Sequence, residues 1–155
     1  MNEGYHYVEC GLDDVYLANG FERIESARGT SVAIRDIDAL HRVIGGHLCR
    51  RKKELNGKEI RFLRREMLMS QATLAHLLDV GEQTVHRWET DKTAMSGAAE
   101  SLLRLLYAEH ALGTKGRIRD RLKRIADLED EMDRNREMTF RLMADKDALW
   151  ELAAA

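Results

Sequence analysis

The chain has 155 residues, of which 44% are apolar and 34% are charged, and its formal net charge is -2 at pH 7. These values describe a globular protein with one domain of ordinary size or two very small ones. No apolar run approaches the roughly 20 residues that span a bilayer, and the first residues, MNEGYHYVE, lack the basic and apolar regions of a signal peptide. We therefore expect a cytoplasmic protein with no membrane partner. The only two cysteines, Cys10 and Cys49, exclude a disulfide framework.

Residues 1–55 are expected to form a small α+β element. From residue 5 to 34 the chain is rich in Tyr, Val, Phe, Ile and Thr, with turn signals at 11–14, 19–20 and 28–29, which predicts short antiparallel strands. Asp36 then has the character of a helix N-cap, and apolar residues at spacings of three and four predict an amphipathic linking helix. Gly45 and Gly46 are expected to weaken this helix midway.

Residues 56–113 are expected to form a helical domain. Asn56 followed by Glu59 predicts a capping box at the first helix, and Ser96 and Gly113 mark the start and stop of the last one. Between them, the segment 69–89 has two short amphipathic stretches on either side of an Asp79-Val80-Gly81 corner, which is the pattern of a helix-turn-helix. A cluster of cations just upstream would attract a polyanion, although such a run is often only a solvated helix face; it contains Arg50, Arg51, Lys52, Lys53, Lys58, Arg61, Arg64 and Arg65.

Residues 114–155 are expected to hold a charged helix from about 116 to 133. Its apolar stripe suits docking on the domain or, as we favour, pairing with a second subunit; it contains Ile118, Leu122, Ile125, Leu128 and Met132. Beyond it, Met138, Phe140 and Leu142 alternate with polar residues, as do Ala148, Trp150 and Leu152, which predicts a β-hairpin. A continued helix is the alternative.

The second stretch of the helix-turn-helix leaves one face without apolar residues. That face carries Glu82, Gln83, Thr84, His86 and Arg87. Gln and Arg can make bidentate contacts to adenine and guanine edges in the major groove, and Gln83 and Arg87 lie four residues apart on one face. A purely structural helix does not need such a face, so it predicts double-stranded DNA as a partner.

The segment from 56 to about 106 resembles the Cro/repressor-like, XRE-type helix-turn-helix family. The resemblance is carried by Met69, Ser70, Gln71, Leu74, Ala75, Leu78, Val80, Thr84, Val85, Arg87, Trp88 and Glu89. It implies a mainly α protein with a five-helix DNA-binding domain, whose third helix, here about 82–90, enters the major groove. Two positions depart from the family pattern. Asp79 stands where Gly is usual at a left-handed corner, and Gly81 stands where a Ser-like cap is common, so we expect a turn that survives with some strain.

The whole chain more weakly resembles the YgiT/MqsA-type regulators, several of which are antitoxins that repress their own operon. In that family a zinc ion on two Cys-x-x-Cys pairs holds the N-terminal part, and this chain has no such pair. The scattered candidates lack established ligand spacing; they are His6, Cys10, His41, His47 and Cys49. We therefore predict no metal and no other cofactor, and we expect the strands to be stabilised by Tyr5, Tyr7, Tyr16 and Phe21.

The predicted site has two parts. For base reading we expect Gln83 and Arg87 first, with Thr84, His86 and Glu82 beside them. For phosphate contacts we expect Ser70 and Gln71 at a helix start, Arg61 and Arg64 from the basic cluster, and Lys92 from the following loop. The structural alternatives are a plain helix-start role for Gln71, packing or an ion pair near Glu89 for Arg87, and a free surface lysine for Lys92. Trp88 is expected in the core, and Glu89 in an internal ion pair.

These features together predict a transcriptional regulator. We expect a homodimeric repressor, or autorepressor, bound to an inverted-repeat operator with half-sites about 34 Å apart. The alternative is an antitoxin whose N-terminal part binds a toxin or another regulator. No catalytic motif surrounds the scattered His and Cys residues, so an enzyme is not expected.

Overall fold

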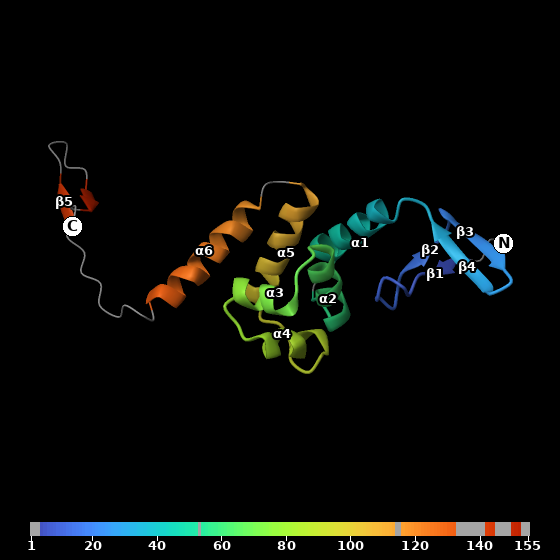
Figure 1. Ribbon diagram of the computed structural model, residues 1–155, viewed down its shortest axis with the longest axis horizontal. Coiled ribbons are helices and arrows are strands. Elements are labelled where there is room, and N and C mark those ends of the chain that lie inside the picture. Colours follow the sequence, from blue (N-terminus) through green and yellow to red (C-terminus); the bar gives the residue numbers. More distant parts are fainter. Residues whose placement is uncertain (1–3, 53, 114–115, 133–141, 145–149, 153–155) are drawn as a thin grey trace.

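The computed structural model describes residues 4–52, 54–113, 116–132, 142–144 and 150–152 (Figure 1). Within these ranges the protein is mainly helical, with three two-stranded antiparallel sheets. The helices are α1 (Ile37–Arg51), α2 (Gly57–Glu66), α3 (Gln71–Leu77), α4 (Glu82–Glu89), α5 (Gly97–Ala111) and α6 (Arg117–Met132). The strands are β1 (Tyr5–His6), β2 (Tyr16–Leu17), β3 (Phe21–Ser26), β4 (Gly29–Ile34), β5 (Leu142–Ala144) and β6 (Trp150–Leu152). None of the described helices is both long and apolar enough to cross a membrane.

The N-terminal strands form as predicted. β1 pairs with β2, and β3 pairs with β4 in a register that runs from Phe21 opposite Ile34 to Ser26 opposite Gly29. Gly29 has a φ of 121°, a conformation that favours glycine, so the tight turn falls at the predicted position. Of the four aromatics expected to hold this element, Tyr7 is buried but Tyr16 is exposed and stacks on His6.

The linking helix α1 runs unbroken through the glycine pair that was expected to weaken it. Asp36 caps it by accepting from the Ala39 amide at 3.1 Å, as expected. A Cβ atom on Gly45 would lie 2.0 Å from the Tyr107 hydroxyl oxygen of α5, so this glycine lets the two helices approach closely. The local pattern could not reveal this, because Tyr107 lies far away in the sequence.

The main core lies among the helices, and it draws on more of the chain than the predicted 56–113 domain. That range contains four helices instead of the five expected; α1 packs on α2 and α5 from one side, and α6 packs on α3 and α5 from the other. Even Leu12 from the N-terminal element and Leu48 from α1 join the core. The predicted boundary at residue 55 therefore divides elements that share one core, since an apolar stripe does not show which neighbour it will contact.

The apolar stripe of α6 divides between two surroundings. Ile118 and Leu122 pack against the core and Ala126 is buried, which is the docking alternative. Ile125 and Leu128 are each 53% exposed. At the C-terminus, β5 and β6 pair antiparallel, as the predicted hairpin requires, whereas Met138, Phe140 and Ala148 lie outside the described residues.

Candidate nucleic-acid interface

The predicted helix-turn-helix is α3, a short corner and α4. Ser70 caps α3 by accepting from the Thr73 amide at 3.0 Å, and the chain turns after Leu78. Asp79 has a φ of 53°, so it does occupy the left-handed corner where glycine is favoured. Gly81 is the N-cap of α4 and makes no side-chain cap hydrogen bond, as expected for a residue without a hydroxyl.

The two faces of α4 differ completely in burial. Val85 is fully buried and Trp88 is buried beside it, facing a core that contains Leu74 and Leu77 of α3. The opposite face is exposed at Glu82, Gln83, His86 and Arg87, and Thr84 is half-buried. All five predicted base-reading residues are thus on one short helix, and four of them lie open to solvent.

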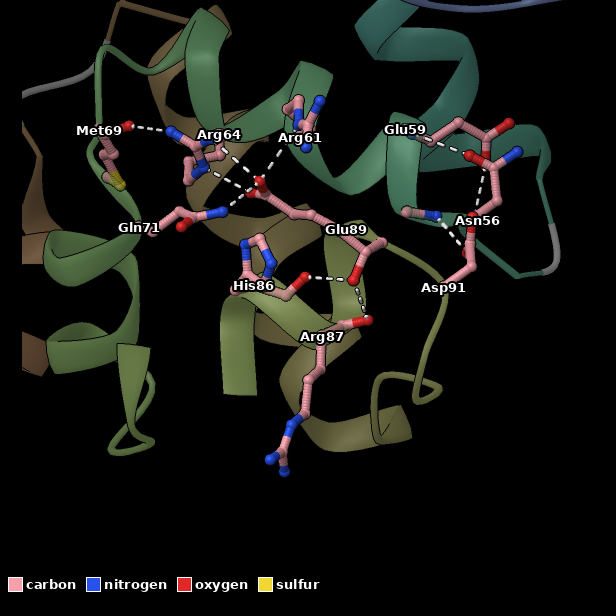
Figure 2. A network of polar contacts seen from close by, with 12 residues as sticks. Asn56, Glu59, Arg61, Arg64, Met69, Gln71, His86, Arg87, Glu89 and Asp91 are labelled. Atoms are coloured by element: carbon pink, nitrogen blue, oxygen red, sulfur yellow. Dashed lines mark hydrogen bonds and ion pairs between the residues drawn. The ribbon is translucent and has the colours of Figure 1, made fainter. Parts of the chain in front are cut away.

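Arg87 does not take its structural alternative. Figure 2 shows its side chain extending away from the polar network around Glu89, and it makes no ion pair or hydrogen bond with the residues that the structure describes. Its backbone oxygen instead accepts from the Lys92 amide at 2.9 Å. The guanidinium is therefore available to a ligand on the outer side of α4.

A buried polar network fixes α4 against the rest of the domain (Figure 2). Glu89, whose side chain is fully buried, accepts from Arg64 Nε at 2.5 Å and Nη2 at 3.1 Å, and from Gln71 Nε2 at 2.8 Å. Arg61 Nε lies 3.4 Å from the same carboxylate, and Arg64 Nη1 donates to the Met69 carbonyl oxygen at 2.7 Å. Burial alone would raise the pKa of Glu89, but the bonds from Arg64, Gln71 and Arg61 outweigh it and hold the pKa below its usual value.

This network corrects two of the predicted phosphate contacts. Arg64 is buried and its nitrogens bond to Glu89 and to Met69, so its role is to hold three segments together. The Gln71 amide group likewise donates inward to Glu89. A charge run does not distinguish an outward arginine from one paired inside, which is why the basic cluster suggested Arg64. The internal ion pair predicted for Glu89 and the core position predicted for Trp88 are confirmed.

The other predicted phosphate residues lie at the surface. Arg61 is 45% exposed although it reaches Glu89, and Lys92 is exposed in the loop after α4. Ser70 is exposed, and its hydroxyl lies 2.9 Å from that of Thr73 as well as capping α3. These three residues come from α2, the start of α3 and the loop after α4.

Two positions that hold α4 in place were missed by the sequence patterns. The Gly57 amide at the start of α2 donates to Asp91 Oδ1 at 2.7 Å, which ties α2 to the loop after α4. A Cβ atom on Gly57 would lie 2.4 Å from the Glu89 carbonyl oxygen, so the close approach of these elements requires glycine. The capping box at Asn56 marks the helix start, but nothing local indicates its distant neighbour.

Cations on α6 also border the helix-turn-helix, and they were not among the predicted site residues. A hollow between α3 and α6 is lined by Thr73, His76, Arg119 and Lys123, together with Ala72 and Leu77. His76 Nε2 lies 3.3 Å from Asp127 Oδ1 across the same junction.

Among the residues that the structure describes, no group of three His, Cys, Asp or Glu side chains is arranged to hold a metal ion. Cys10 and Cys49 are free thiols, and burial raises the pKa of each. Comparison with protein-family models, curated proteins and solved structures found no match to the chain.

Proposed function

We propose that the protein is a sequence-specific double-stranded DNA-binding regulator that acts as a homodimer and represses transcription by occupying an inverted-repeat operator. The observation that carries this proposal is the contrast between the two faces of α4, one buried and apolar, the other exposed and carrying Glu82, Gln83, His86 and Arg87. The resemblance of residues 69–89 to XRE-type helix-turn-helix proteins supports it independently of the geometry.

In this proposal α4 lies in the major groove. Arg87 reads a guanine and Gln83 an adenine, since their side chains match those base edges and lie one helical turn apart. Thr84 and His86 contact a thymine methyl group or the backbone, and Glu82 accepts from a cytosine amino group. Arg61, Ser70 and Lys92 contact phosphates, while Arg64 and Gln71 act from inside by orienting Glu89 and with it α4.

The test begins with selection of bound DNA from a random pool, followed by affinity measurements on every single-base-pair variant of the selected site. We expect Arg87→Ala to lose about 1 to 3 kcal/mol at one base pair of each half-site and to relax specificity there. Lys92→Ala is the matched control, because an exposed phosphate contact should weaken binding to all sequences alike and reduce the salt slope by about one. A uniform loss for Arg87→Ala would contradict its assignment as a base reader.

A second function rests on the hairpin of β3 and β4, which is the outer hairpin of the N-terminal element. Residues 22–31 are all exposed, and within the described residues β3 and β4 pair only with each other. Such a ribbon has two free edges for strand addition by a protein partner, which is the surface that an antitoxin would need. Co-expression with the neighbouring gene product tests this, and co-purification that survives Arg87→Ala but is lost on replacing Ile24 with Lys would support it.

A further inference from the structure

The outer face of α6 has apolar side chains that no described part of the chain covers. Ile118 and Leu122 pack inward, and Ala126 is buried. Ile125 and Leu128 lie three residues apart and are each 53% exposed, so they form one small apolar patch at the middle of the helix. Aliphatic residues three apart on an exposed helix face supply one turn of a helix-pairing seam.

The charges along α6 are segregated on either side of this patch. Its first half carries five exposed cations against one exposed carboxylate, Asp120, and the cations make no ion pair with any described residue; they are Arg117, Arg119, Arg121, Lys123 and Arg124. By sequence, its second half is acidic, with Glu129, Asp130 and Glu131 after the patch and Asp127, which faces His76, within it. The helix therefore has a net positive charge before the apolar patch and a negative one after it.

We propose that α6 pairs antiparallel with α6 of a second copy of this chain. With the twofold axis between Ile125 and Leu128, Ile125 of one copy packs against Leu128 of the other. Arg121 and Arg124 of each copy then lie opposite the acidic half of its partner. A parallel pair would instead place like charges together, so the charge pattern selects the antiparallel orientation. This inference deepens the proposed function, which requires a homodimer but does not say how it forms.

The arginines of α6 could instead bind the phosphates of DNA, but that role does not account for the apolar patch. If α6 bound DNA, Ile125 and Leu128 would stay exposed to water beside the phosphate backbone. Pairing of two α6 helices removes both side chains from water and also places opposite charges near each other. The pairing is small, because α6 has 16 residues and is about 24 Å long. We therefore expect a concentration-dependent equilibrium between monomer and dimer.

Sedimentation equilibrium of the full chain without DNA tests the pairing separately from the DNA-binding proposal. The double variant Ile125→Lys, Leu128→Lys should weaken dimerisation by about tenfold or more, while circular dichroism stays unchanged because both side chains are exposed. Leu105→Lys, Leu112→Lys is the control on α5 and its C-cap, where Leu105 is 51% and Leu112 is 78% exposed. A wild-type chain that stays monomeric, or a dimer weakened only by the α5 variant, would overturn the proposal, even if DNA binding is confirmed.

The orientation has its own two readouts. Added salt should weaken an antiparallel dimer, because it screens attraction, and should strengthen a parallel one. In the antiparallel pair, the two copies of residue 117 are about 28 Å apart, at 1.5 Å per residue from the axis. Under mild oxidation a mixture of Ile125→Cys and Leu128→Cys chains should therefore form a mixed cross-link, and Arg117→Cys should not cross-link to itself. Efficient cross-linking through Arg117→Cys would sink the antiparallel arrangement.

Discussion

The N-terminal β element and the helical domain are built by different means. In the helical domain, the ends of α2, α3 and α4 meet at the buried Glu89 carboxylate, and the surrounding side chains form one continuous core. The β element contributes few buried side chains, notably Tyr7, Leu12 and Leu17, and residues 22–31 of its outer hairpin are all exposed. Its polar links to the helices are Tyr7 to His41 at 2.9 Å and Asp13 to Lys58 at 2.7 Å.

This difference indicates where each region can tolerate change. The helical domain orients α4 through contacts that are desolvated, so losing one partner leaves a buried group unsatisfied. The β element is joined to the helices partly through solvent-exposed groups, whose loss water can compensate. We therefore expect equivalent substitutions to have large effects in the first region and small effects in the second.

The largest difference is expected between the buried ion pair of Glu89 with Arg64 and the exposed ion pair of Asp13 with Lys58. Glu89→Gln keeps the shape of the side chain but leaves Arg64 charged and buried, and we expect it to lower the free energy of unfolding by about 3 to 5 kcal/mol. Asp13→Asn, which breaks the exposed pair with Lys58, should cost less than about 1 kcal/mol. Urea unfolding of both variants measures the difference, and comparable losses would remove the distinction between the regions.

The pH dependence of Glu89→Gln adds an independent check. Because the folded-state pKa of Glu89 lies below its ordinary value of 4.5, its carboxylate contributes stability that is fully present above that pH. The contribution is lost as the pH falls through the folded-state pKa. The stability gap between wild type and Glu89→Gln should therefore be constant from pH 7 to about 5.5 and narrow at lower pH. A gap that widens in acid would contradict this sign.

The two adjacent glycines of α1 test how closely the helices pack. Gly45→Ala places a Cβ 2.0 Å from the Tyr107 hydroxyl and should destabilise the fold by about 1 to 3 kcal/mol. Gly46→Ala meets only the flexible end of Arg50, 3.0 Å away, and should stabilise α1 by up to about 1 kcal/mol through helix propensity. We therefore expect the two substitutions to shift the midpoint temperature of thermal unfolding in opposite directions. If both raised it, α1 and α5 would be able to separate at little cost.

These glycines also show what the sequence could predict. The caps at Asp36, Asn56, Ser70 and Ser96 are local, because each side chain binds a backbone amide three residues ahead, and all four were predicted. The strand turns and the polar face of α4 could also be predicted, because each depends only on residues close together in the sequence. The role of Gly45 depends on Tyr107, which no short pattern links to it.

The candidate site divides in the same way. Gln83 and Arg87 were placed correctly on an exposed face, because helical spacing determines which residues share a face. Arg64 and Gln71 were misplaced, since both turn toward Glu89, which lies 25 and 18 residues further along the chain. Sequence reasoning predicted which residues share the exposed face of the candidate site, and the structure was needed to show which residues orient that face.

Breaking the hydrogen bond that links the two regions through Tyr7 should have an intermediate effect on the free energy of unfolding. Tyr7→Phe removes a part-buried hydrogen bond to His41 Nε2, whose other ring nitrogen lies 2.8 Å from Glu66 Oε1 on α2. We expect a loss of about 1 kcal/mol. Hydrogen exchange should show faster exchange in β1 and β2 but little change in α3 and α4. If α4 loosens equally, the β element is part of the unit that holds α3 and α4 and not an attachment to it.

Small gains in stability are expected at two strained positions within the helical domain itself. Leu68 and Asp79 have φ values of 55° and 53°, and Leu68 is also 90% exposed, so its side chain contributes little packing. Leu68→Gly should therefore raise the free energy of unfolding by about 1 kcal/mol, and Asp79→Gly by less, because aspartate tolerates this backbone conformation better than leucine does. Both gains, measured by urea unfolding, should leave DNA affinity unchanged if α4 is already held in place by Glu89. A gain in affinity from Asp79→Gly would instead mean that strain at the corner displaces α4 from its DNA-bound position.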